Sequence, residues 1–368
     1  MVTTNRPARG LNWTGMRAPG ARALIVVLLT GVLLRADSGA RLIQAPSPFA
    51  AQIAALSEPA GYFDTDNLIS NERSYLQVIQ DLRKRQVRGG AYIGVGPDQN
   101  FSYIAEIRPS IAYMVDVRRD NLLMHLLFKA LFAESRTRIE YLAQLTGRAV
   151  PADVDAWRAA PIDRLVAHID AQPAPAGVDA LRRRIDEAIA RFGVPITAAE
   201  RATIDRFHRR FIADGLSLRF QSTGRAPQSY YPTLRDLLRE TDESGRQANY
   251  LAAEEAFQFV KGLEARDLIV PVVGNLAGTT AMPAIAAAIA ARHEKVSAFY
   301  VSNVEFYLSG DGTFPRFAAH VGRLPHAANA VIIRSIFGRY AAPSRPGDGS
   351  VSQLQTIEDF LREHGAGR

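Results

Sequence analysis

Two glycines and an aspartate have the types and the spacing of a nucleotide-binding turn. Gly94 and Gly96 end the short apolar run 91–96, and a helical pattern follows from residue 100. Because glycine carries no Cβ, the backbone amides of such a turn can approach a ligand closely. Asp116 comes 22 residues after Gly94, close to the roughly 20 residues typical of a carboxylate that binds ribose hydroxyls. A tight turn without a ligand, with Asp116 as a helix N-cap, fits the same residues.

Asp98 lies in the same turn and restricts which nucleotide could bind there. A full dinucleotide fingerprint has a third glycine three residues after the second, and this position is Gln99. A carboxylate beside a pyrophosphate is repulsive. The turn therefore disfavours NAD, FAD and nucleotide sugars, and it favours a nucleoside-like ligand without phosphate groups.

The elements that must position these residues predict an α/β protein. A strand over 91–96, a helix over 100–107 and a strand over 111–116 form a right-handed βαβ unit. Further apolar runs share this near-continuous pattern, at residues 268–273, 296–301 and 330–334. Strands of this kind are buried on both faces. We therefore predict a Rossmann-like, mostly parallel sheet with helices on both faces and a mainly helical insertion.

The remaining pattern is mostly helical. The sequence predicts a long amphipathic helix over 120–147, a capping box at Thr197 and Glu200 that opens a helix ending at Gly215, a short strand over 216–220 and a last helix over 353–364.

The predicted organisation is a signal peptide or N-terminal anchor (1–40), a lead-in loop and helix (41–88), the first half of the Rossmann-like domain (89–148), a helical insertion or cap (149–265), the second half (266–340) and a C-terminal loop and helix (341–368).

Composition excludes several classes of site. The chain has no cysteine, which rules out disulfides, thiolate zinc sites, iron–sulfur clusters and cysteine nucleophiles. Its seven histidines lack the spacing that would place two ligands on one helical face, so we predict no metal site. Of the net charge of +7, residues 1–40 carry +4, from five arginines and one aspartate. The small charge that remains argues against nucleic-acid binding.

The first forty residues have the order of a secretory signal. Four arginines precede the apolar run 23–34, and the small residues 38–40 follow it. The run has 12 residues, whereas a membrane-spanning helix needs roughly 20. We expect an exported protein, periplasmic or secreted, that would contact a membrane only through residues 1–40 if these stay uncleaved. An over-extended start site, with the protein in the cytoplasm, is the alternative.

Two motifs resemble those of the class I, Rossmann-like methyltransferases that depend on S-adenosylmethionine. The string 92–98, Tyr-Ile-Gly-Val-Gly-Pro-Asp, is similar to their first motif, and Tyr113-Met-Val-Asp116 is similar to their second-strand acid. The resemblance covers residues 89–140 and 266–335. Tyr92 replaces the usual acid before the first glycine. The strings 63–72, 269–275 and 299–305 also resemble an uncharacterised bacterial family with a methyltransferase-like fold.

The resemblance implies a set of site residues. The residues implied to bind S-adenosylmethionine are Gly94, Gly96, Asp98, Asp116, Gly274 and Asn275. Ligands of open α/β sheets bind at the carboxyl ends of strands, so the substrate-side candidates are Glu72, Asn303, Glu305 and Tyr230. Each candidate has a plain structural alternative. Glu72 can serve a turn or a cap, Asn303 can satisfy a strand end, Glu305 can be solvated, and Tyr230 can pack under a cap.

The leading hypothesis is therefore a protein that binds S-adenosylmethionine and methylates a small molecule. Methyl transfer depends mainly on alignment of donor and acceptor, so it requires no catalytic dyad that a motif would reveal. An export signal conflicts with a cofactor that is made inside cells. The alternative is an extracytoplasmic ligand-binding or interaction protein without catalytic activity, on the same scaffold.

Overall fold

The computed structural model describes residues 46–365, except 174–176, 224–225, 227, 339–344 and 346. The predicted signal segment, residues 1–40, lies outside this part of the chain. Within it, no helix combines the length and the apolar character that crossing a bilayer requires.

A six-stranded sheet forms the centre of the fold, in the strand order β3-β2-β1-β4-β5-β6. The first five strands are parallel and β6 pairs antiparallel with β5. The strands are β1 (Ala91–Val95), β2 (Ile111–Asp116), β3 (Ile269–Val273), β4 (Val296–Ser302), β5 (His326–Phe337) and β6 (Ser350–Thr356). All side chains of β1 and β3 are buried, as their uninterrupted apolar sequences predict. The predicted Rossmann-like, mostly parallel sheet is confirmed.

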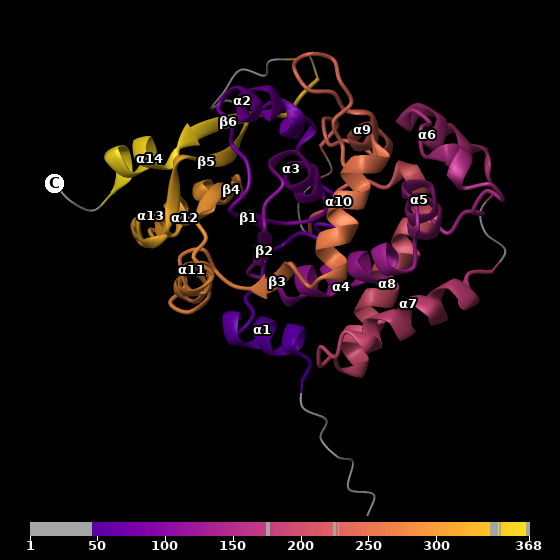
Figure 1. Cartoon of the computed structure of the whole chain (residues 1–368), viewed down its shortest axis with the longest axis horizontal. Helices are drawn as coiled ribbons and strands as arrows, with labels where there is room; N and C mark the ends of the chain where they lie inside the picture. Colours follow the sequence, from indigo (N-terminus) through magenta and orange to yellow (C-terminus); the bar gives the residue numbers. More distant parts are fainter. Residues whose placement is uncertain are drawn as a thin grey trace, which may run out of the picture. The chain divides into compact units, whose positions relative to one another are not determined.

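Helices cover both faces of the sheet (Figure 1). One face carries α3 (Gln99–Ile107), α4 (Arg119–Ala133) and α10 (Glu254–Ala265), and α2 (Ile79–Lys84) contacts α3. The other face carries α1 (Pro48–Leu56), α11 (Ala281–Ala291), α13 (Phe314–Arg323) and α14 (Ile357–His364), with α12 (Val304–Gly310) beside α13. A short 3₁₀ helix, η1 (Arg73–Leu76), contacts β6.

The predicted insertion is mainly helical, and it packs outside the α4 layer. Its α7 and α8 contact α4, and α6 contacts α5 and α9. The elements of the predicted insertion, residues 149–265, are η2 (Asp155–Trp157), α6 (Ile162–Ala171), α7 (Asp179–Arg191), α8 (Ala198–Asp214), η3 (Gly215–Ser217), α9 (Leu234–Arg239) and α10, of which α10 packs on α3 and α4. The helix α5 (Arg138–Leu145) precedes the insertion. The predicted capping box at Thr197 and Glu200 is present at the start of α8.

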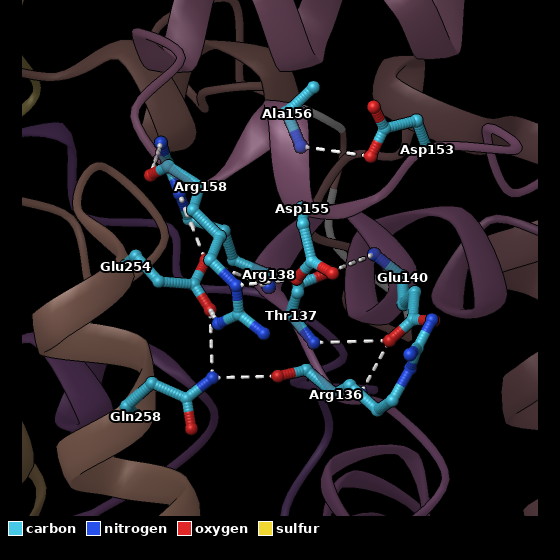
Figure 2. A network of polar contacts seen from close by, with 10 residues as sticks. All are labelled: Arg136, Thr137, Arg138, Glu140, Asp153, Asp155, Ala156, Arg158, Glu254 and Gln258. Carbon is cyan, nitrogen blue, oxygen red and sulfur yellow. Dashed lines mark hydrogen bonds and ion pairs between the residues drawn. The ribbon is translucent and has the colours of Figure 1, made fainter.

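One buried arginine joins this layer to the rest of the molecule. Arg138, the first residue of α5, donates to the carbonyls of Leu251 and Ala252 before α10, at 2.8 and 3.0 Å. It also donates to the carbonyls of Arg158 and Ala160 before α6. Figure 2 shows Arg138 beside Arg158 and Glu254.

Three local predictions are wrong. The segment 120–147 forms two helices, α4 and α5, because Thr137 and Glu140 build a capping box that starts a new helix. The segment 216–220 forms the turn η3 and one isolated bridge instead of a strand. The segment 353–364 begins inside β6, and Thr356 caps a shorter helix, α14.

Candidate functional site

A cavity of about 250 Å³ opens at the carboxyl ends of β1 to β4. The strand order reverses between β1 and β4, and ligands of open α/β sheets bind at such a switch point. Five predicted site residues line this strand-end cavity: Gly96, Asp116, Gly274, Asn275 and Asn303. The other five, Gly94, Asp98, Glu72, Glu305 and Tyr230, are not part of its lining.

Residues 57–72, here called the lead-in segment, run along these strand ends. Glu58 accepts hydrogen bonds from the backbone N–H groups of Asn275, Thr280 and Ala281, at 2.7, 3.2 and 3.1 Å. These donors lie between β3 and the start of α11, where orphan amides favour a carboxylate. Gly61 donates to the carbonyl of Val117, at 2.8 Å. The lead-in segment thereby supplies Tyr62, Phe63, Thr65, Asn67, Ser70 and Asn71 to the cavity lining.

Asp116 lies at the end of β2 and is paired with Arg118. Its Oδ1 accepts from the backbone N–H and the Nε of Arg118, at 2.8 and 3.2 Å, and its Oδ2 accepts from Nη2, at 3.0 Å. Arg118 also donates to the carbonyl of Thr65, at 2.8 Å. A carboxylate has about four acceptor positions, and these contacts use three of them. Asp116 therefore holds Arg118 against the lead-in segment, and it lines the cavity with one acceptor position unused by these contacts.

The two glycines of the turn have different roles. Gly94 packs against Asn100, and a Cβ at Gly94 would lie 1.9 Å from Asn100 Oδ1. Asn100 in turn donates to the carbonyls of Val95 and Pro97, at 2.8 Å each. Gly96 has φ +82°, a conformation that favours glycine, and it lines the cavity. Gly94 thus shapes the turn from behind, and Gly96 presents backbone to the cavity.

Asp98 is buried beneath the turn and faces the helical layer. Its Oδ2 accepts from the Tyr250 hydroxyl, at 3.2 Å, and Tyr250 also contacts Tyr141. Burial raises the pKa of Asp98 to about 6. The residue is therefore an interior acid at the base of α3, and its repulsion of a phosphate in the turn would be weaker than its sequence position suggests.

The raised pKa of Asp98 predicts a pH dependence of stability. An acid whose folded pKa lies above its unfolded value binds more protons when folded, so stability falls as pH rises from the unfolded pKa, about 4, to the folded pKa, about 6. We expect Asp98→Asn to abolish this fall, which amounts to roughly 3 kcal/mol. Urea unfolding of both proteins at pH values across this interval measures it. A constant difference between the two proteins would contradict the prediction.

Glu72 is buried behind the cavity, with 1% of its surface exposed. Its Oε2 accepts from the Tyr300 hydroxyl, at 2.7 Å, and the hydroxyls of Ser302 and Ser335 also donate to its carboxylate. The Ser70 hydroxyl accepts from the Glu72 backbone N–H, at 3.0 Å, and fixes the start of this turn. Burial raises the pKa of Glu72, and the three hydroxyls oppose that rise.

Of the three remaining substrate-side candidates, one lies in the cavity lining and two lie outside it. Asn303 lines the cavity at the end of β4. Glu305 pairs with Arg334, at 3.1 Å, and burial raises the pKa of this carboxyl. Tyr230 packs against Gly349, where a Cβ would lie 2.0 Å from the Tyr230 ring. Glu305 and Tyr230 are structural contacts in this arrangement.

Several cavity residues were missed by the sequence reasoning. They are the aromatic residues Tyr62, Phe63, Phe220 and Tyr307, the polar residues Gln99 and Ser302, and the acid Asp311. Ser302 had a detectable signal, because it directly follows an apolar strand, as Asn303 does. The aromatic residues had none, since Phe63 and Tyr307 come together, at 4.9 Å between ring centroids, from distant parts of the chain.

The lining is rich in acceptors. Asp116 and Asp311 are its charged side chains, and within the described residues no lysine, arginine or histidine lines it. Gln99 donates to the Tyr300 oxygen, at 3.2 Å, because the Tyr300 proton is directed to Glu72. This leaves the buried Gln99 Oε1 without a donor among the described residues. An unpaired buried acceptor is costly, and a ligand that donates a hydrogen bond would satisfy it.

Fold and cavity together define a Rossmann-like α/β protein with a cavity at its strand ends. The chain belongs to a protein family whose model is described as a domain of unknown function (DUF7790), which matches residues 67–157 and 208–365. No curated protein matches the sequence. In the part of the chain that the structure describes, no three histidine, aspartate or glutamate side chains are grouped as metal ligands.

Proposed function

We propose that the chain binds S-adenosylmethionine in the strand-end cavity and transfers its methyl group to a small molecule. The acceptor-rich lining is the observation that carries this proposal. Asp116, Asp311 and the unpaired Gln99 Oε1 favour a ligand with positive charge and N–H or O–H donors. S-adenosylmethionine has a sulfonium, an ammonium and ribose hydroxyls, and it carries no phosphate.

The lining residues suit the parts of this ligand. The free acceptor position of Asp116 would take a ribose hydroxyl. Gly96 allows close approach of backbone, and His125 fixes the turn because its Nε2 contacts the Gly96 carbonyl, at 3.0 Å. Burial lowers the pKa of His125 to about 4, so the ring is neutral and adds no positive charge beside the cavity. The aromatic residues of the lining offer surfaces for a purine base.

A second candidate, a ligand-binding or interaction protein without chemistry, is favoured by two observations. Arg118 already holds the Asp116 carboxylate through three hydrogen bonds. Two large apolar side chains are also exposed beside the cavity: Tyr62, in its lining, is 79% exposed, and Phe306, next to Tyr307, is 61% exposed. Exposed aromatic residues of this kind are common at interaction surfaces.

Calorimetric titration of the full chain tests the proposal. We expect S-adenosylmethionine and S-adenosylhomocysteine to bind with micromolar affinity, about −8 kcal/mol, and ADP to bind far more weakly. Asp116→Asn should lower the affinity at least tenfold, because the amide keeps the shape of the side chain and loses its charge.

Glu305→Gln provides the matched control, because it removes a carboxylate at the same end of the sheet that does not line the cavity. Its affinity should stay within about twofold of the wild type, a difference of roughly 0.4 kcal/mol. Absence of binding to both adenosyl ligands would overturn the proposal and favour the second candidate, as would equal effects of the two substitutions.

A further inference from the structure

Glu72 has the surroundings of a proton acceptor. Three hydroxyls donate to its buried carboxylate, and within the described residues it takes part in no ion pair. A carboxylate without a cationic partner is easier to protonate than a paired one. The titratable groups that interact with it are Tyr92, Tyr103 and Tyr300, and burial raises the pKa of each tyrosine well above its usual value. These tyrosines are therefore neutral, which leaves Glu72 as the group in this cluster that can carry a charge, and burial raises its pKa above the usual range of a glutamate.

The nearest cations along the chain are paired elsewhere. Arg73 pairs with Glu240, at 3.1 Å, and Arg334 pairs with Glu305, also at 3.1 Å. Neither guanidinium therefore fixes Glu72 in its ionised state.

Ser302 connects this carboxylate to the cavity. Of the three hydroxyl donors, Ser302 lines the cavity, whereas Tyr300 and Ser335 are not part of its lining. Ser302 has φ +52° at the end of β4, in the left-handed region that serine rarely adopts. Its hydroxyl donates to Glu72, so its oxygen lone pairs are available to accept from a ligand in the cavity. The unusual backbone is consistent with a functional demand on this side chain.

We propose that Ser302 and Glu72 form a proton path that takes up the proton released by the methyl acceptor, which is therefore a hydroxyl compound or a neutral amine. This inference rests on the proposed function, and it specifies the substrate class. Ser302 Oγ accepts the acceptor's O–H or N–H proton while its own proton passes to Glu72. The acceptor's electron pair forms the bond to the methyl carbon, and the bond from that carbon to sulfur breaks with its electrons left on sulfur. Glu72 then returns its proton to solvent.

Ser302→Ala and Ser335→Ala form a matched pair for the test. Each removes one hydroxyl donor from the same carboxylate, and of the two side chains Ser302 is the one in the cavity lining. The assay measures S-adenosylhomocysteine formed by the full chain from S-adenosylmethionine. The protic acceptors are phenol, catechol and aniline, and dimethyl sulfide serves as an acceptor that loses no proton.

We expect Ser302→Ala and Glu72→Gln to lower kcat at least about 100-fold, the scale of general-base catalysis, with the Kd of S-adenosylmethionine unchanged within about twofold. Ser335→Ala should lose less than about tenfold. The wild-type rate should rise with pH through one ionisation that is absent in Glu72→Gln. With dimethyl sulfide, Ser302→Ala should keep the wild-type rate. Equal losses in the two serine variants, or a loss with dimethyl sulfide as large as the loss with the protic acceptors, would overturn the inference.

Infrared titration of Glu72 provides a readout that needs no acceptor. A carboxyl band of the wild type that is absent in Glu72→Gln should titrate above the usual range of a glutamate and within the pH range over which the protein stays folded, and it should shift in Ser302→Ala. A carboxyl that stays in one protonation state across this range would overturn the proton path. Failure to bind S-adenosylmethionine would instead refute the proposed function, and this titration would still decide whether Glu72 exchanges protons. The titration gives the same decision about Glu72 in the case where the cofactor binds but none of these acceptors is methylated.

Discussion

Replacing Arg138 with methionine is expected to destabilise the protein by about 4 kcal/mol, the largest effect among the substitutions considered. The side chain is almost fully buried and donates to four carbonyls. Methionine has similar length but no donor, so these carbonyls would lose their partner, and Glu254 would lose a charge partner 3.6 Å away. Breaking a buried charged contact on one side costs about 3–5 kcal/mol.

Arg136→Met is the matched control in the same network (Figure 2). Arg136 is 71% exposed and pairs with Glu140 four residues later, a type of contact that contributes roughly 0.5 kcal/mol or less. Guanidinium unfolding followed by circular dichroism gives both free energies. A loss below about 1 kcal/mol for Arg138→Met, or equal losses for the two variants, would show that the four carbonyl contacts are not what stabilises the helical layer.

Gly94→Ala is expected to cost about 3 kcal/mol through steric overlap. The new Cβ would lie 1.9 Å from Asn100 Oδ1, and 2.7 and 2.9 Å from atoms of Tyr92. Asn100 cannot move away freely, since it is fully buried and its amide holds two carbonyls of the turn, while its Oδ1 accepts from the Tyr92 hydroxyl. The substitution therefore forces β1 and α3 apart.

Gly262→Ala provides the opposite expectation for the same chemical change. Gly262 lies within α10, and a Cβ there meets no atom within 4 Å. Alanine in a helix interior is favoured over glycine by about 0.5–1 kcal/mol, so this variant should be more stable than the wild type. Urea denaturation of both variants tests the pair. A stability for Gly94→Ala within about 1 kcal/mol of the wild type would show that the turn can rearrange around a methyl group.

The sheet was predictable because its signals are local. Each buried parallel strand is a short apolar run, and Thr197 with Glu200 marks a helix start by residue type alone. The same local signals failed where a cap interrupts an apolar pattern, as at Thr137, which divides the expected helix over 120–147 into two. Local periodicity continues through such a cap, so it does not reveal where one helix ends.

The candidate site was predictable only in part, since most of its contacts join distant residues. The strand-end rule places Gly96, Asp116 and Asn303 in one cavity. It does not reveal that the hydroxyl partners of the Glu72 carboxylate lie 228 to 263 residues away. Contacts of this range leave no periodic trace in the sequence.

The lead-in segment has a consequence for synthesis on the ribosome. It emerges before any strand of the sheet, yet Glu58 binds Asn275, 217 residues later, and Glu72 binds Ser335, 263 residues later. Closing such long loops carries an entropy cost before any contact offsets it. The early strands can begin to associate while translation proceeds, but Glu58 lacks its partners until the start of α11 has been made, and Glu72 lacks Ser335 until β5 has been made. The cavity is thus among the last parts of the molecule to form, because its lining is complete only after Asp311 has been made.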